Sequence, residues 1–532
     1  MFVRVKRSVQ NGATYEYLQV VESFRKEGKP RQRVIATLGR RDVLVASGAL
    51  DGLLQSLGKF SQRLRVVEAV RTQGLVARTS KVWGPALVFG RLWENQGVAD
   101  IVRGLAQGRR FGFDAERATF ALALQRLCSP GSDLQGSGWV NTVEAPGLER
   151  MALHHLYRTT GFLAEVREDL EWELFAQDRD LFSQELDLVF FDTTSVFVHR
   201  SEETEWRKRG YSRDHRPDLP QWILAVAVDS YGWPISWEVF PGNTADPRAL
   251  EAMVGKMRER FRIRRVILVA DRGMISPKTI GVLTGPPLAP YDYILGCRMR
   301  KQKEIREEVL GRAGRYREVN GHLKVKEVRI EQGRYILCLN EEEARKDAAA
   351  RVAIVERLQD LLAKKGPKSL VGNKGFSRFL SLDKGSVRIN EKAVEADQRM
   401  DGKFVLKTNT ELPAEEVAQA YKNLWRVERI FREEKSTLEV RPIFHHRDDT
   451  SIGHIVASFL ALRLEVDLKR RLDEKKIEGS WPDLMRDLAQ VQAVHVELDG
   501  HQYLLRTDLK GVAHQAFVAA GVRPPSPVTL LT

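Results

Sequence analysis

The stretch that decides the fold is Leu186-Asp187-Leu188-Val189-Phe190-Phe191, which Asp192 follows directly. This apolar run is too short for an ordinary helix and suits a strand that is buried on both faces. Similar runs follow at residues 222–228, 235–240, 265–270 and 291–296. The sequence therefore predicts five strands in this part of the chain.

Two helices are expected between these strands. Asp246 and Pro247 suit the N-cap and the first turn of a helix that runs to about residue 261, and a shorter helix is expected after Ser276 and Pro277. The order is then three strands, a helix, a strand, a helix and a strand. This order predicts an α/β fold with a mixed sheet and helices on its faces.

The flanking regions have other patterns. Residues 1–45 alternate polar and apolar side chains on both sides of a Lys/Gly/Pro turn, which predicts a basic β-hairpin module. Residues 46–180 are mostly helical in pattern, and the Gly-rich segment 131–138 predicts a loop within them. Residues 300–410 hold further strands. Amphipathic helices are expected at residues 341–365, 413–435 and 452–475.

Composition limits the class of protein. The 532 residues are 43% hydrophobic and 29% charged, so the chain is long enough for large cores and for three or four domains. A net charge of +14 favours a polyanionic partner, most often nucleic acid and less often an acidic membrane face. Three distant cysteines without a C-x-x-C pair predict reduced thiols in the cytoplasm, and no apolar run is long enough to span a membrane.

Two aspartates occupy equivalent positions. Asp192 directly follows the first apolar run, and Asp271 directly follows the fourth. Side chains at the carboxyl ends of central strands project toward the usual ligand crevice of an open α/β sheet. Taken singly, each aspartate is more often a turn or cap residue, but the pair together favours a catalytic site.

A third feature lies in the expected helix at 413–435. Tyr421, Glu428 and Lys435 are spaced by seven residues, close to two helical turns, and therefore line one helix face. A simple ion pair on the helix explains the same residues equally well. If Glu428 joins Asp192 and Asp271, three carboxylates form an oxygen-rich site that suits two ions of Mg²⁺ or Mn²⁺. Such a pair of ions cleaves phosphodiesters.

Several motifs resemble one family closely. The segment from Tyr421 to Lys435 is similar to the Tyr-x2-Arg-x3-Glu-x6-Lys signature of DDE transposases of bacterial insertion sequences, in the group usually called insertion sequence family four. Blocks elsewhere resemble the same group: residues 210–218, 241–246, 270–274, 441–446, His454 and 459–462. The likeness spans nearly the whole chain.

The resemblance implies an RNase H-like catalytic domain in which Asp192, Asp271 and Glu428 are the metal ligands. By the same resemblance, Tyr421 and Lys435 hold phosphates near the cleaved end. The signature arginine falls on Leu424, which cannot bind phosphate, and Arg426 and Arg432 are the candidates to replace it. The implied domains are a hairpin module (1–45), a helical DNA-end-binding region (46–180), the catalytic domain (181–298 and 411–475), a strand-rich insertion (299–410) and a C-terminal region (476–532).

The expected function is DNA transposition. The protein would bind double-stranded DNA at terminal inverted repeats, cleave it and join the 3′ ends to target DNA, as a homodimer in the cytoplasm at the nucleoid and without a membrane partner. The alternatives are a catalytically inactive DNA-binding descendant and an RNase H-like nuclease. Residues 445–449 form a weaker candidate metal cluster, for which a polar loop is the more favoured interpretation, and Asn243 and Asp246 are either site-lining or turn and cap residues.

Overall fold

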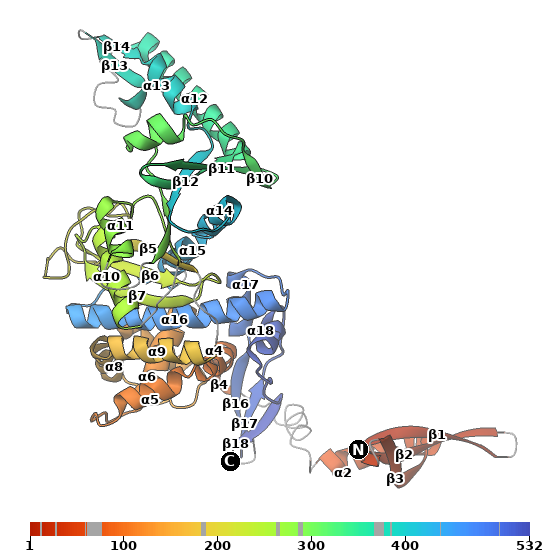
Figure 1. Cartoon of the computed structure of the whole chain (residues 1–532). Helices are drawn as coiled ribbons and strands as arrows, with labels where there is room; N and C mark the ends of the chain where they lie inside the picture. The colour runs from red at the N-terminus through yellow and green to blue at the C-terminus, as the bar shows by residue number, and fades with distance from the viewer. Residues whose placement is uncertain are drawn as a thin grey trace. The chain divides into compact units, whose positions relative to one another are not determined.

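A computed structural model gives the structure of the protein (Figure 1). It describes residues 1–10, 13–26, 29–58, 60, 77–181, 188–261, 267–285, 291–365, 377–383, 386–436, 438–498 and 501–531. The chain forms two compact units. The first comprises Met1–Gly84, Arg486–His514 and Arg523–Thr532, and the second comprises Pro85–Met485 and Gln515–Val522.

The second unit contains a nine-stranded sheet in the order β10-β11-β12-β15-β9-β8-β5-β6-β7. The five strands expected from the apolar runs are β5 (Leu188–Phe197), β6 (Gln221–Val228), β7 (Pro234–Pro241), β8 (Ile267–Ala270) and β9 (Asp292–Gly296). Strands β5, β8 and β9 are parallel, whereas β6 and β7 pair antiparallel. The predicted mixed α/β sheet is confirmed. Leu186 and Asp187 lie outside the described residues.

The chain that follows β9 extends this sheet. Its strands are β10 (Arg317–Asn320), β11 (Leu323–Ile330), β12 (Gly333–Asn340) and β15 (Lys403–Thr408), and β15 pairs directly with β9. The predicted amphipathic helix is α12 (Glu341–Lys365). The same segment holds η2 (Ile305–Val309), η4 (Ser377–Phe379), β13 (Leu380–Asp383), β14 (Ser386–Ile389) and α13 (Glu391–Gln398).

Helices cover both faces of the sheet. On one face, α9 (Arg167–Leu181), α10 (Asp246–Glu259) and α11 (Pro277–Thr284) share a core with Val189, Phe191 and Ala270. On the other face, α14 (Ala414–Lys422) contacts β8 and β9, and α15 (Trp425–Ser436) contacts β5 and β6. Because successive strand residues point to opposite faces, Asp192 points away from the core of Phe191.

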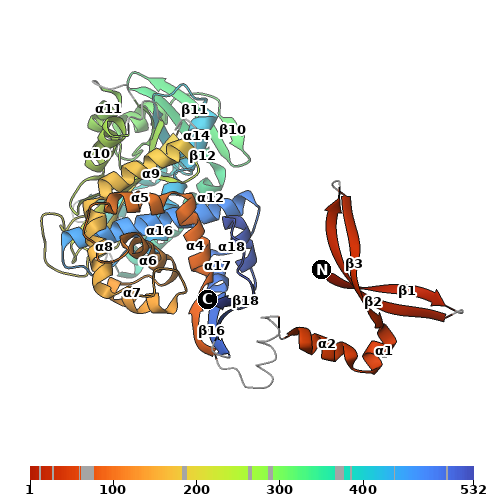
Figure 2. The same cartoon turned by 90° about the horizontal axis from the view of Figure 1, so that it is seen from below.

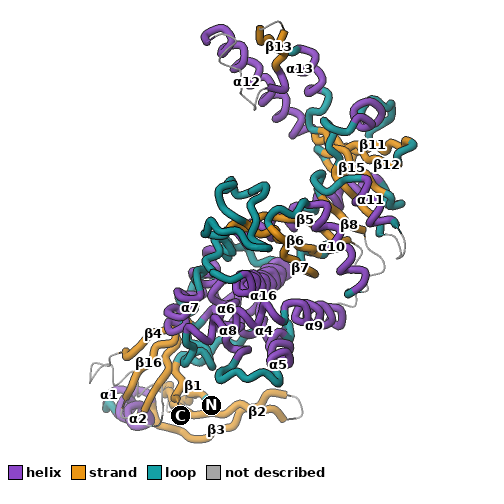
Figure 3. Tube along the Cα trace, turned by 90° about the vertical axis from the view of Figure 1, so that its left-hand side faces the viewer, coloured by secondary structure: helices purple, strands orange, loops and turns teal. Residues whose placement is uncertain are grey.

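A helical layer completes the second unit, and Figure 3 shows its helices in purple beside the strands. Its central element, α16 (Asp448–Glu474), is buried along most of its length and contacts α6 and α8. An added Cβ at Gly453 would collide with the backbone oxygen of Thr160, so glycine allows α16 to approach α8 closely. The other helices are α4 (Gly84–Asn95), α5 (Val98–Ala106), α6 (Ala115–Cys128), α7 (Asp133–Trp139), η1 (Val140–Thr142), α8 (Leu153–Glu165), α17 (Trp481–Ala489) and α18 (Ala513–Ala520).

The first unit contains two small sheets. Its N-terminal sheet consists of β1 (Phe2–Gln10), β2 (Ala13–Lys26) and β3 (Lys29–Arg40), and the long strand β2 pairs with both neighbours (Figure 2). Helices α1 (Arg41–Ala46) and α2 (Ala49–Gly58) follow. The second sheet has the order β18-β17-β16-β4, with β4 at Ala77–Val82, β16 at Gln492–Leu498, β17 at His501–Arg506 and β18 at Val528–Leu531.

Three expectations are corrected here. The N-terminal part of the predicted DNA-binding region is not mostly helical, because residues 1–45, expected as a hairpin module, contain three strands. The Gly-rich segment 131–138 is largely the helix α7, which Ser132 caps through a hydrogen bond to the Gln135 backbone. The N-cap of α10 is Ala245, and Asp246 is the first helical residue. In the described part of the chain, no helix is both long enough and apolar enough to cross a bilayer.

Candidate active site

Asp192 and Asp271 are neighbours on parallel strands. Phe191 of β5 pairs with Ala270, the last residue of β8, and Asp192 and Asp271 are the residues that directly follow this pair. Asp192 therefore lies inside β5, four residues past its start, and not after the strand as expected. Both aspartates continue the face that α14 and α15 cover, because their preceding residues point into the opposite core.

The environment of Asp192 is strongly charged. Burial, the largest effect, raises the pKa of Asp192 to about 7, and the nearby carboxylates of Asp271 and Asp246 act in the same direction. The Arg213 guanidinium opposes this shift, with Nη1 at 3.9 Å from Asp192 Oδ1. A buried carboxylate beside other carboxylates is an arrangement that a bound cation would stabilise.

Arg213 is a site residue that the sequence analysis missed. It comes from the segment between β5 and β6, where its backbone N–H donates to Ser195 Oγ over 2.9 Å. Its Nη2 donates to Thr193 Oγ1 over 2.9 Å and to both carboxylate oxygens of Asp246 over 3.0 Å. Asp246 is therefore a site-lining residue. The available signal was the charged run at residues 210–218 between two apolar strands.

Tyr421 reaches the second aspartate. Its hydroxyl donates a hydrogen bond of 2.9 Å to Asp271 Oδ1, and burial raises the pKa of Tyr421 above its usual value, so the hydroxyl keeps its proton. An added Cβ at Gly296, the last residue of β9, would collide with this hydroxyl. Glycine at the end of β9 thus makes room for the contact between Tyr421 and Asp271.

The expected continuous helix at 413–435 is broken. It divides into α14 and α15, with Asn423 and Leu424 between them. The Leu424 N–H donates to the Tyr421 backbone oxygen, and the Arg426 N–H donates to that of Asn423. These bonds span three residues, whereas those of an α-helix span four. Tyr421 is therefore on a different helix from Glu428 and Lys435, and a spacing of seven does not by itself place it on their face.

Glu428 lies on α15, the helix that contacts β5 and β6, and its side chain is exposed. Among the described residues, the group of ligand-type side chains whose ligand atoms all lie within 4.8 Å of one another is a different one. The structure therefore brings Asp192 and Asp271 together and places the helix of Glu428 against their sheet, without joining the three carboxylates in one such group.

Lys435 pairs with a buried carboxylate. Its Nζ lies 2.8 Å from Asp214 Oδ1, and Arg441 Nη1 lies 3.2 Å from the same oxygen. The side chain of Asp214 is only 3% exposed, and its Oδ2 has no hydrogen-bond partner. Burial lowers the pKa of Lys435, and Asp214 opposes that shift. Arg441 is a second cation here that the sequence analysis did not single out.

The two candidates for the missing signature arginine lie elsewhere on α15. Arg426 is near the turn between β6 and β7, where it acts on the Asp229 carboxylate, and it also stacks against the Trp425 ring. Arg432 has an exposed side chain. Leu424 itself is buried, which agrees with its lack of a phosphate-binding role.

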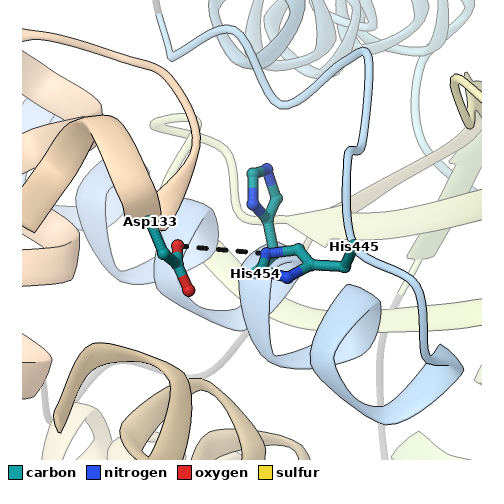
Figure 4. Close-up of side chains that lie close together, drawn as sticks. All are labelled: Asp133, His445 and His454. Atoms are coloured by element: carbon teal, nitrogen blue, oxygen red, sulfur yellow. Dashed lines mark ion pairs between the residues drawn. The ribbon is translucent and has the colours of Figure 1, made fainter. Parts of the chain in front are cut away.

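The group that meets the 4.8 Å limit is Asp133, His445 and His454 (Figure 4). Of the candidate cluster at residues 445–449, only His445 belongs to it. The ring of His446 contacts Arg200, Asp448 pairs with Arg207 and Asp449 pairs with Arg447. Sequence reasoning missed Asp133 because the segment around it was expected to be a loop.

Two known protein families match parts of the chain. The family described as the transposase DDE domain matches residues 183–464, which is more than half of the chain. The chain belongs to the DDE transposases. The family described as the IS1634 family transposase N-terminal domain matches residues 3–74, so this DDE transposase is an enzyme of the insertion-sequence type. The finer assignment to insertion sequence family four is not confirmed by these matches.

The similarity of the chain to individual proteins is weak. No curated protein matches this transposase. The cryo-EM structure of a piggyBac transposase synaptic complex with hairpin DNA is similar at 11% identity and a TM-score of 0.40, over 76% of this chain and 79% of that one. So distant a likeness carries no argument about this transposase.

Proposed function

We propose that this transposase binds terminal inverted repeats, hydrolyses a DNA phosphodiester bond there and joins the freed 3′ ends to target DNA. The proposed ligands of two divalent ions, Mg²⁺ or Mn²⁺, are Asp192, Asp271 and Glu428. The observation that carries this proposal is that Asp192 and Asp271 directly follow the paired residues Phe191 and Ala270 of two adjacent parallel strands, and that α15 packs against β5. The order β7-β6-β5-β8-β9 supports the RNase H-like arrangement that the resemblance implies.

The residues fit such ions. Carboxylate oxygens are the ligands that Mg²⁺ and Mn²⁺ prefer. Burial is the main cause of the raised pKa of Asp192, Asp271 and Asp246 act in the same direction, and a bound cation would favour the ionised carboxylate. When bound, the ions would activate the attacking oxygen and stabilise the leaving oxygen.

The chain's own residues would position the reacting groups. Tyr421 holds the Asp271 carboxylate through its hydroxyl. Arg213 holds Asp246 and lies near Asp192, so it fixes the charged surroundings of the ligand pair. Lys435 and Arg441 share one buried carboxylate, so their two positive charges exceed the one negative charge of Asp214. We propose that a DNA phosphate binds this surplus charge.

The remaining proposals concern DNA binding and assembly. We propose that residues 1–180 bind the DNA ends. The strands β1 to β3 support this role, because exposed basic side chains such as Arg7, Arg31 and Arg33 lie along them. We also propose a homodimer that brings two ends together, acts in the cytoplasm at the nucleoid and belongs to the family-four-like group of insertion sequences.

The test uses the DNA that borders the gene. A duplex carrying the terminal repeat is incubated with the full chain and Mg²⁺, with a chelator in a parallel reaction and a scrambled end as a second substrate. We expect a metal-dependent nick at the repeat end that Glu428→Gln abolishes. Tight binding without any metal-dependent nick would support the inactive DNA-binding alternative, and nicking without preference for the repeat would support an RNase H-like nuclease.

A further inference from the structure

Asp133, His445 and His454 form a second group of ligand-type side chains, apart from the acidic residues of the proposed active site. Asp133 begins α7, His445 lies between α15 and α16, and His454 belongs to the second turn of α16. Their ligand atoms all lie within 4.8 Å of one another, and Figure 4 shows the three side chains converging. The group therefore joins segments that are more than 300 residues apart in the sequence.

The group is buried. Asp133 is 1% exposed and His454 is 3% exposed, while the His445 side chain is 9% exposed. Neither ring nitrogen of His454 makes a hydrogen bond of normal geometry, although the Val440 backbone is near enough to act on the ring. A buried polar group without a partner costs about 1–3 kcal/mol. A ligand on the ring would give a His454 nitrogen a partner of normal geometry.

The packing around the group holds it together. Gly453 lets α16 approach the backbone of Thr160 on α8, and the Thr160 hydroxyl donates to Asp133 Oδ2 over 2.8 Å. Arg126 Nη2 donates to Asp133 Oδ1 over 3.4 Å. Metal-binding carboxylates are commonly held in this way by outer hydrogen bonds. The contacts of Gly453 and Thr160 thus bring His454 next to an oriented carboxylate.

We propose that Asp133, His445 and His454 bind one divalent transition-metal ion of the zinc type. Two imidazoles and one carboxylate are typical ligands of Zn²⁺, whereas Mg²⁺ prefers oxygen alone. A metal ion binds the neutral form of a histidine ring and can displace its proton. His445 Nε2 lies 3.9 Å from Asp133 Oδ1, slightly wider than the roughly 3.4 Å between two ligands of a tetrahedral zinc ion.

The nearby Arg126 does not exclude a cation. Its positive charge is offset by Asp133 and by Glu439, which also acts on it, and Asp449 acts on His445. The ion would fix the segment that follows α15 to α7 and α16. That segment also contains Arg441, so the role is a positioning one for the proposed phosphate site.

The experiment measures metal binding by the full-length protein. The chelator-treated protein is titrated with Co²⁺, whose visible absorption reports a four-coordinate site with nitrogen ligands, and Zn²⁺ is then added as a competitor. Asp192→Asn is included in the background of every titration, so that the proposed active site cannot supply the signal. We expect one equivalent of Co²⁺ to bind to this protein and to be displaced by Zn²⁺.

Matched variants locate the site. We expect His445→Gln and His454→Gln to weaken binding by more than about 100-fold, because losing a ligand exceeds the 10- to 100-fold effect of losing an outer partner. His446→Gln is the control: it changes the neighbouring histidine, which contacts Arg200, and we expect unchanged binding. X-ray absorption of the Zn²⁺-loaded wild type, showing two imidazole ligands, tests the proposal without any variant.

The proposal is overturned if wild-type protein binds no Co²⁺ or Zn²⁺ at micromolar concentration. It is equally overturned if binding survives both His445→Gln and His454→Gln, or if the absorption spectrum shows oxygen ligands alone. The result is independent of DNA cleavage: a protein that binds zinc through these residues but cleaves nothing supports this site and contradicts the proposed function.

Discussion

The two groups of ligand-type side chains differ in how their charges are satisfied. Around Asp192 and Asp271, most charged groups already have partners within the protein, as Arg213 has in Asp246 and Lys435 has in Asp214. Around Asp133 and His445, the ring of His454 is buried without a hydrogen bond of normal geometry. A site that exchanges DNA must be stable without it, whereas a site that keeps its ion can leave ligand atoms unpaired. This difference fits the two proposals, which are turnover at the first group and permanent ion binding at the second.

The largest effect should come from Asp192→Asn. Losing one ligand of the catalytic ions removes transition-state stabilisation of several kcal/mol, which corresponds to a loss of more than about 1,000-fold in strand cleavage. Binding of the terminal-repeat duplex should be unchanged. Cleavage on a labelled duplex and a gel-shift titration check the two expectations. Asp218→Asn is the matched control, because Asp218 is exposed and pairs with Arg216.

The same variant has a pH-dependent effect on stability. The pKa of Asp192 is raised to about 7 in the folded protein, mainly by burial. The stability that its protonated form contributes is present at low pH and is lost as the pH rises through about 7. In chelator, the free energy of unfolding of the wild type should therefore fall between pH 5 and 8 more than that of Asp192→Asn. Parallel curves for the two proteins would contradict the assigned environment of Asp192.

The second effect concerns protein stability at the proposed zinc site, with and without the metal. In chelator, His454→Leu should be as stable as the wild type or more stable, because neither buried nitrogen of the His454 ring makes a hydrogen bond of normal geometry, and such a group costs about 1–3 kcal/mol. With Zn²⁺ at 100 times its dissociation constant, the wild type gains about 2.7 kcal/mol and should become the more stable protein. Urea unfolding with and without Zn²⁺ measures this reversal. A variant that is equally destabilised in both conditions would make His454 an ordinary core residue.

The third effect concerns DNA affinity, in which two cations of α15, Lys435 and Arg426, should differ. Lys435→Gln should lower the affinity for DNA about tenfold at low salt and reduce the slope of log K against log salt by about one, because one phosphate contact is lost. Arg426→Gln should leave both unchanged, because Arg426 lies near Asp229 and the Trp425 ring. Fluorescence anisotropy at several salt concentrations measures both. A reduced slope for Arg426→Gln alone would make Arg426 the replacement for the signature arginine.

The strands of the catalytic sheet were predictable because their apolar runs are local signals. The run at residues 222–228 lies in β6 and misses only its first residue, Gln221, and the amphipathic pattern at 341–365 has the same bounds as α12. The break between Tyr421 and Trp425 was not predictable from periodicity. Residues spaced by seven share a face only if the helix is continuous, and the spacing does not reveal that backbone bonds around Asn423 span three residues instead of four.

Features that depend on tertiary packing could not be predicted from local pattern. The pairing of β15 with β9 joins strands more than 100 residues apart. The convergence of Asp133 with His454 depends on the close approach of two helices at Gly453. Asp271 at the end of β8 was found because its strand ends where the apolar run ends. Arg213 was missed because nothing in its charged segment indicates which carboxylate it contacts.

The smallest effect should come from Tyr421→Phe, which removes a positioning contact and leaves the ligands in place. The hydroxyl donates to Asp271 Oδ1, so its loss should raise the Mg²⁺ concentration needed for half-maximal cleavage about tenfold, while cleavage at saturating Mg²⁺ falls by less. Tyr231→Phe, at an exposed turn, is the control.

Gly296→Ala should reduce cleavage more than Tyr421→Phe does. Its Cβ would collide with the Tyr421 hydroxyl and approach the Arg272 backbone nitrogen to 2.9 Å. In the double variant, the contact with the hydroxyl is gone, while the contacts of the added Cβ with the Arg272 nitrogen and with the ring carbon Cζ at 3.1 Å remain, so the loss should be smaller. A cost of Gly296→Ala that is the same in both backgrounds would show that the Tyr421 hydroxyl does not occupy this position, and Tyr421 would then have no part in orienting Asp271.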